Sequence, residues 1–470
     1  MKKVTLGWMA IVLVLFPILL LLGIFMRAVQ ANGLANAEEW FYPFMTLHGV
    51  GMVGVWYVGA MACAERVIAR YTGSNDGLSY VAMGGTVAGV VLLLVCVLGG
   101  KFASGWYFLY PLPFKGTWPI WSATTFLLAM TVMGAAWLVW SLGLLVGIAR
   151  KYSLSHALGW HYIGGATEPD VPPAVIITTV SLLAAVASLL AGVVVLVFFF
   201  VELLFGIRSD ALLMKNLTFF FGHVLVNLSL YLGVAVIYDV LPEYAGRPWK
   251  ANKIVAISWN SVLAIVLMAY AHHLYMDFVQ PTSLQYLGQI ASYASSLPPA
   301  VVTIFGALTL VFHAKMRWTL ASGMFFLALM GWAIGGVGAV IDSTIAVNAK
   351  FHNTLWVPAH FHTYMLEGLV LMVLGYFYHY VQEHTRIPES GLVRILTLGL
   401  FVIGGYGFLA TFYLSGANSV PRRFATYPAE VAHGATDSAV GVMFAALFLL
   451  GLVVFTASAL RRWFRASSDG

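Results

Sequence analysis

The chain has very little charge and almost no cysteine. Asp, Glu, Lys and Arg make up 9% of its 470 residues, whereas 61% are hydrophobic. Because about a quarter of the residues in a typical soluble domain are charged, this composition excludes an ordinary soluble enzyme. The two cysteines, Cys63 and Cys96, lie in separate apolar stretches and form no CxxC pair. The sequence therefore predicts neither a thiolate metal site nor a disulfide framework.

Long apolar stretches make up most of the sequence. About twelve of them are long enough to cross a hydrocarbon core of about 30 Å. They lie near 5–29, 44–65, 79–100, 119–149, 173–204, 211–241, 253–275, 291–313, 318–342, 354–382, 392–415 and 435–461. Spans in lipid must be helices unless they close into a barrel, and these stretches do not alternate as barrel strands do. We expect an all-α integral membrane protein, surrounded by lipid, with a single domain over 1–470.

Basic residues are distributed unevenly among the loops. They gather near 2–3, 65–70, 149–152, 246–253, 313–317 and 461–465. A twelve-helix alternation puts all of these on one side, which the positive-inside rule identifies as cytoplasmic. We therefore expect both termini in the cytoplasm, and the first span to be retained rather than cleaved as a signal peptide. The net charge of +6 follows from these loops, so we expect no nucleic-acid partner.

Six histidines lie inside five of the apolar stretches. An ionisable residue at membrane depth indicates a functional site by default. The six are His48, His223, His272, His273, His360 and His362. With the predicted orientation, all fall in the outer half of the membrane or near its mid-plane. Six further histidines receive no role: His156, His161, His313, His379, His384 and His433.

The spacing of His360 and His362 in WVPAHFH adds a geometric constraint. Two residues apart on an α-helix means about 200° around it, so one helix can serve a different centre on each side. The consecutive pair His272–His273, joined by a histidine from another helix, is a plausible trigonal site. Imidazole ligands suit copper, iron or zinc.

Together these motifs resemble the catalytic subunit of the heme–copper oxidase superfamily, and the B-type oxidases most closely. The resemblance covers nearly the whole chain and implies the subunit I bundle, with two hemes and one distal metal. It makes His48 and His362 the axial ligands of a low-spin heme, expected to be heme b. His360 would hold a high-spin heme, whose type stays open. The implied ligands of the distal metal are His223, His272 and His273. Three histidines without a carboxylate favour copper, with iron as the alternative.

The same resemblance assigns residues near the outer ends of the helices. In VPRR, Arg422 and Arg423 would bind heme propionates, since arginine pairs with carboxylates in bidentate fashion. This role explains two basic residues on the side that otherwise lacks them. His352 would lie in the same propionate region.

One position departs from the oxidase pattern. The family usually reads GHPxVY in its sixth helix, whereas this chain reads GHVLVN and has Asn227 where the tyrosine stands. Val266 takes the alternative tyrosine position of C-type oxidases, and Tyr270 is about 200° away from His272 and does not replace it. An amide supplies neither a proton nor a radical for O–O cleavage. The sequence therefore predicts a nitric oxide reductase, with a terminal oxidase that reduces O2 as the nearest alternative. A heme-based gas sensor or heme transporter is an alternative from another class. Such a protein would not need the three histidines His223, His272 and His273, which we call the trio.

Two further residues are candidates for proton supply. Glu367 lies seven residues after His360, which places it on the same helical face within about 20° and about 10 Å further inward. A packing role for this carboxyl is an equal alternative. Tyr238 matches a polar position of the B-type proton channel, although Val234 replaces another.

The resemblance also implies partners and a location. We expect a smaller subunit carrying a cupredoxin or cytochrome domain, and an external donor such as cytochrome c or a copper protein. The expected location is the cytoplasmic membrane of a bacterium or archaeon.

Overall fold

The computed structural model describes residues 1–312, 314–385 and 387–468, and His313 lies outside them. The regular secondary structure of the described residues is helical, apart from one isolated β-bridge between Thr354 and Pro421. Twelve helical segments are long and apolar enough to cross a membrane, which confirms the predicted class. They are α1 (Lys3–Gln30), α2 (Glu38–Thr72), α3 (Asp76–Leu94) with η1 (Val95–Gly99), α4 (Ile120–Tyr152), α7 (Pro173–Phe205), α8 (Ala211–Ala245), α9 (Lys253–Ala269) with η3 (Tyr270–Leu274), α10 (Thr282–Ala300) with η4 (Val301–Phe305) and α11 (Gly306–Phe312), α12 (Leu320–Asp342), α14 (Trp356–Tyr364) with η5 (Met365–Val370) and α15 (Leu371–Glu383), α16 (Gly391–Ala417), and α17 (His433–Ser468).

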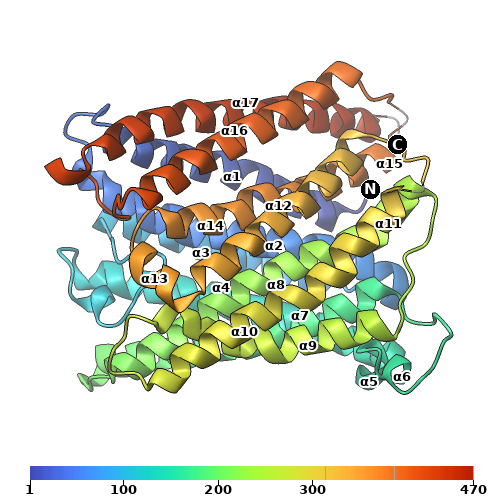
Figure 1. Ribbon diagram of the computed structural model, residues 1–470, viewed down its shortest axis with the longest axis horizontal. Coiled ribbons are helices and arrows are strands. Elements are labelled where there is room, and N and C mark those ends of the chain that lie inside the picture. Colours follow the sequence, from blue (N-terminus) through green and yellow to red (C-terminus); the bar gives the residue numbers. More distant parts are fainter. Residues whose placement is uncertain (313, 386, 469–470) are drawn as a thin grey trace.

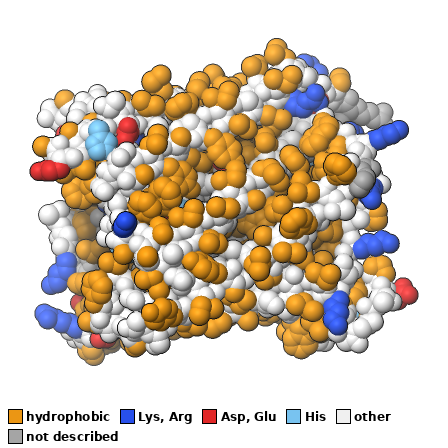
Figure 2. All heavy atoms as spheres, in the orientation of Figure 1, with side chains coloured by type: hydrophobic (Ala, Val, Ile, Leu, Met, Phe, Trp, Pro, Cys, Tyr) orange, Lys and Arg blue, Asp and Glu red, His pale blue; other side chains and the backbone are white. Residues whose placement is uncertain are grey.

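The long helices run side by side, and both chain termini lie at the same end of the bundle (Figure 1). The space-filling view shows hydrophobic side chains across the middle of the molecule, while most charged side chains lie towards its two ends (Figure 2). Short elements occupy the connections: η2 (Leu112–Phe114), α5 (Leu154–Ala157), α6 (Trp160–Ile163), α13 (Ile345–Phe351) and η6 (Ala429–Val431). This distribution is the one expected of a bundle whose middle faces lipid.

Four of the twelve spans are not uniform α-helices. Segments η1, η4 and η5 are π-helical, and η3 is a 3₁₀-helix. Such interruptions occur frequently at functional sites, and the apolar pattern did not predict them. The eighth span also begins earlier, at Thr282, than the apolar stretch near 291–313 indicated. Its first turns are polar, which lowers their hydropathy without preventing helix formation.

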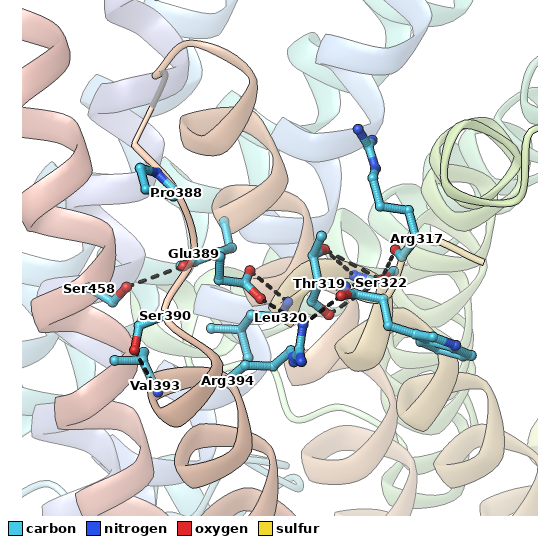
Figure 3. Close-up of polar contacts among 12 residues, drawn as sticks. Arg317, Thr319, Leu320, Ser322, Pro388, Glu389, Ser390, Val393, Arg394 and Ser458 are labelled. Carbon is cyan, nitrogen blue, oxygen red and sulfur yellow. Dashed lines mark hydrogen bonds and ion pairs between the residues drawn. The ribbon is translucent and has the colours of Figure 1, made fainter. Parts of the chain in front are cut away.

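Side-chain caps fix where two of the spans begin on the side of the termini (Figure 3). The Thr319 and Ser322 side chains form a capping box at the start of α12. The carboxylate of Glu389 accepts a hydrogen bond from the free Leu320 N–H at 2.9 Å. Arg394 of α16 lies 3.5 Å from the same carboxylate. These contacts tie the start of α12 to the start of α16.

Candidate metal centre

His48 of α2 and His362 of α14 face each other. Their ring centroids are 6.4 Å apart and the planes differ by 18°. The Nδ1 of His48 lies 2.8 Å from the Leu19 carbonyl, and that of His362 lies 2.7 Å from the Pro358 carbonyl. Because a carbonyl only accepts, each Nδ1 carries the proton and each Nε2 keeps its lone pair. Two metal–nitrogen bonds of about 2 Å fill most of the separation, so the pair fits two axial ligands of one ion.

His223, His272 and His273 form a second cluster, in which one nitrogen from each ring lies within 4.8 Å of the other two. His223 comes from α8, and the consecutive histidines come from η3. Nδ1 of His223 lies 3.2 Å from Nε2 of His273, close enough for one ion to contact both. The three imidazoles are half-buried and the group includes no carboxylate, so the cluster fits the predicted imidazole site.

A serine on the neighbouring helix sets the orientation of His272. Its Nδ1 lies 2.9 Å from Ser292 Oγ, whose own proton goes to the Gly288 carbonyl. The hydroxyl must therefore accept from Nδ1–H, which leaves Nε2 of His272 for a metal. Gly288 permits this close approach, since a Cβ there would come within 2.8 Å of the His272 backbone nitrogen.

His360 lies on the α12 side of its helix, away from the pair formed by His48 and His362. A Cβ added at Gly338 of α12 would come within 3.1 Å of its Nδ1, and its ring centroid is 5.3 Å from that of Tyr364. His362 instead lies beside Phe408 and Phe412 of α16. One helix thus presents its two histidines to different surroundings, as the spacing predicted.

A single cavity of about 1000 Å³ joins all these groups. This volume is at the upper end for small-molecule and cofactor sites. The predicted residues that line it are His48, His223, Asn227, His272, His273, His352, His360, His362, Arg422 and Arg423. The remaining lining is largely apolar, with residues such as Leu20, Phe16 and Val370, which suits a large flat cofactor.

Basic residues border one part of this cavity. The bridge between Thr354 and Pro421 holds the two loops that carry them together. Burial and the neighbouring Arg423 lower the pKa of Arg422 to about 9, and its buried Nε has no hydrogen-bond partner among the described residues. Burial also lowers the pKa of His352, to about 4, with Arg422 contributing. A buried guanidinium without an anion is costly, so this region fits the carboxylates of a bound heme.

Asn227 lines the cavity next to the trio. Its amide nitrogen donates to the His223 carbonyl at 2.8 Å and lies 3.3 Å from Nε2 of the same histidine. With the NH2 group turned to its own helix, the Oδ1 atom is the part left for other contacts. Tyr270 does not line the cavity, and its hydroxyl donates to Asn216. This placement agrees with its exclusion as a substitute tyrosine.

Glu367 and Tyr238 lie away from the cavity wall. Glu367 is fully buried in η5 against Gly331 of α12 and Gly405 of α16. Glu367 and His360 are seven residues apart, and the α12 glycines that they contact, Gly331 and Gly338, are also seven residues apart. Glu367 and His360 therefore both face α12, but the Glu367 carboxyl group extends towards α16. Neither of its oxygens has a hydrogen-bond partner among the described residues. The Tyr238 hydroxyl lies 3.1 Å from that of Thr303 in η4.

Several residues that line the cavity were not predicted from the sequence. Ser292 orients His272, and Tyr231, Asp342 and Tyr364 also line the cavity. Tyr231 lies eight residues after His223, which is a helical spacing that the sequence already contained. Tyr364 likewise follows His360 by four residues on α14. Ser292 and Asp342 depend on contacts between helices, which no local pattern shows.

Comparison with known proteins agrees with this geometry. The family model described as cytochrome c and quinol oxidase polypeptide I matches residues 3–459. Cytochrome c oxidase subunit 1 of Thermus thermophilus is 24% identical over 97% of this chain and 83% of that protein. Cytochrome c oxidase polypeptide 1 of Halobacterium salinarum is 27% identical over 52% of this chain and 40% of that protein. Among solved structures, a heme–copper terminal oxidase dimer covers 98% of this chain and 84% of that one, with a TM-score of 0.77 and 19% identity.

The bundle and its histidines define a membrane-bound respiratory oxidoreductase. The chain belongs to the heme–copper oxidase subunit I family. This family uses hemes and a distal metal, and the histidine pair, the trio and the arginines fit such groups on the geometry given above.

Proposed function

We propose that this protein reduces nitric oxide to nitrous oxide. The observation that carries the proposal is Asn227, an amide in the cavity wall beside the trio. The family resemblance implies a tyrosine at this position in oxidases. Among the described residues, the side-chain hydrogen-bond partners of the trio are Ser292, Asn227 and one another, with no tyrosine hydroxyl. Two NO molecules need two electrons and two protons to give N2O and water. Breaking O2 needs four electrons at once, part of which the tyrosine supplies in oxidases.

The ligand roles follow from the two histidine groups. His48 and His362 would hold a low-spin heme, expected to be heme b, and His360 would hold the high-spin heme. The trio would hold the distal metal, for which three imidazoles favour copper over iron. When bound, these groups supply the electrons and the site at which NO is reduced. The guanidinium groups of Arg422 and Arg423, beside His352, would bind the propionates.

Chain residues would also move the protons. The buried Glu367 carboxyl, without a partner among the described residues, can carry one proton on either oxygen. The Tyr238 hydroxyl, next to Thr303, would form part of a route from the side of the termini. Asn227 Oδ1 would accept a hydrogen bond from an O–H or N–H group of a protonated reaction product in the cavity. An amide does this without titrating itself.

We further propose the setting of the reaction. A smaller subunit with a cupredoxin or cytochrome domain would deliver electrons from the side opposite the termini, drawn from cytochrome c or a copper protein. Both termini would lie in the cytoplasm of a bacterium or archaeon. A terminal oxidase remains the second candidate, because the named relatives are cytochrome c oxidases.

Gas consumption by the purified complex tests the proposal. NO and O2 should be supplied separately with the same electron donor, and N2O should be measured by gas chromatography. We expect two NO consumed for each N2O formed, and slower O2 reduction. Asn227→Gln should keep most NO turnover, whereas Asn227→Leu, of similar volume but without hydrogen bonds, should lower it. Reduction of O2 to water well above the rate with NO would instead identify an oxidase.

A further inference from the structure

A second group of possible metal ligands lies outside the lining of the cavity, towards the ends of α8 and α15. It consists of Glu243 on α8 with His379 and Glu383 on α15, and we call it the Glu–His–Glu cluster. One imidazole nitrogen and one oxygen from each carboxylate lie within 4.8 Å of one another. His379 Nε2 is 3.4 Å from Glu383 and 3.9 Å from Glu243. The two helices thus bring three ligand atoms of the kinds that bind divalent cations into one place.

His379 is held as a ligand would be. Its side chain is 1% exposed, and its Nδ1 lies 2.9 Å from the Tyr244 hydroxyl. The tautomer that donates Nδ1–H to Tyr244 has its lone pair on Nε2, which points at the two carboxylates. Within the described part of the chain this buried Nε2 has no hydrogen-bond partner. Metal-binding histidines nearly always give their second nitrogen to such an outer partner.

Among the described residues, the two carboxylates of the cluster form ion pairs with a single guanidinium. Arg70 of α2 lies 2.9 Å from Asp239, 2.8 Å from Glu243 and 3.8 Å from Glu383. One guanidinium therefore faces three carboxylates. Two other arginines near the cluster, Arg66 and Arg317, lie over the Tyr380 and Tyr244 rings instead. Two carboxylates beside an imidazole Nε2 that has no hydrogen-bond partner among the described residues form a ligand set that suits a divalent ion.

We propose that the Glu–His–Glu cluster binds a divalent transition cation of the zinc type, at a site separate from the histidines of the cavity. One imidazole and two carboxylates leave the fourth tetrahedral position of zinc to water. The carboxylates are about one-third exposed, 36% and 39%, so an ion can enter from the side of the chain termini. A bound ion would bridge α8, which carries His223, and the span that carries His360.

Zinc binding to the purified holoenzyme tests this site. Equilibrium dialysis with radioactive zinc should give one added ion per chain, and X-ray absorption at the zinc edge should show one imidazole per ion. His379→Ala should weaken binding by at least about tenfold, the loss seen when even an outer partner of a ligand is removed. Intact heme spectra would show that this variant folds.

Two controls separate the site from other histidines. His384→Ala, five residues further along the same helix end, should leave zinc affinity unchanged, because that ring bonds the Tyr380 carbonyl instead. The exposed Glu383→Gln should weaken binding even if His379→Ala fails to fold. A two-imidazole spectrum that disappears in His156→Ala would place the zinc at His156, His161 and Asp170, the other such group on this face, and would overturn the proposal. Unchanged affinity in both cluster variants would do the same.

Discussion

The histidine pair and the histidine trio are positioned by different parts of the protein. In the pair, both Nδ1 atoms donate to backbone carbonyls, those of Leu19 and Pro358. In the trio, the contacts come from side chains, chiefly Ser292 and Asn227. Backbone carbonyls are not removed by substitution, so the acceptors of the pair are present whatever side chains stand at positions 19 and 358. The trio can be adjusted one side chain at a time, which makes it the part where related chains can acquire different chemistry.

Removing a ligand of the pair should have the largest effect on bound groups. His362→Ala and His48→Ala should each abolish the low-spin heme signal, because no other described imidazole faces the vacated position. His360→Ala should remove the high-spin signal and spare the low-spin one, since its ring lies on the other side of α14. Optical and electron paramagnetic resonance spectra distinguish the two hemes. Loss of both hemes in every variant would show that the two hemes do not bind independently.

Removing a ligand of the trio should leave both hemes in place. His223→Ala should lower the distal metal from one per chain to none and reduce NO turnover to background, since two imidazoles hold such an ion poorly. Metal analysis and N2O production measure the two effects. Full activity in this variant would exclude the trio as the reaction site.

An intermediate effect should come from the side chain that supports the trio. Ser292→Ala removes the acceptor for His272 Nδ1–H and should weaken distal-metal affinity by about 10–100-fold, the usual range for such partners. Competition with a chelator of known affinity gives the value. Ser295→Ala is a suitable control, because that hydroxyl bonds only a carbonyl of its own helix. Equal losses in both variants would mean that α10 packing, and not the hydrogen bond, matters.

The smallest effect should come from crowding the pair without removing a ligand. A Cβ at Gly23 would come within 2.9 Å of His48 Cε1, so Gly23→Ala should tilt that ring and strain its bond to Leu19. We expect the low-spin heme to stay bound with a shifted absorption band, and stability to fall by about 1–3 kcal/mol. Gly147→Ala, where a Cβ meets nothing within 4 Å, should change neither. A band at its native position in Gly23→Ala would show that the ring moves freely.

Sequence reasoning reached the twelve spans because each is an uninterrupted apolar stretch, and lipid leaves such stretches few alternatives to a helix. It also separated His360 from His362, since that argument needs only the local pitch of one helix. It did not predict which residues orient the histidine rings. Leu19, Ser292 and Gly338 contact the histidines from other helices, and their positions depend on how the whole bundle packs. The direction of the Glu367 carboxyl depends likewise on Gly405, on a helix packed against it.

The π-helical segment η5 determines how the length of its span can vary. It lies between His360 and His362 on one side and His379 on the other, within a single span. A π turn is in effect an α-helix with one residue inserted, and each residue of an α-helix turns it by about 100°. Because the π turn takes up the extra residue locally, His379 and Glu383 of α15 keep nearly the same phase relative to His360 and His362, although the span is one residue longer. The length of this span can therefore change by one residue within Met365–Val370 without re-aiming the side chains at either of its ends.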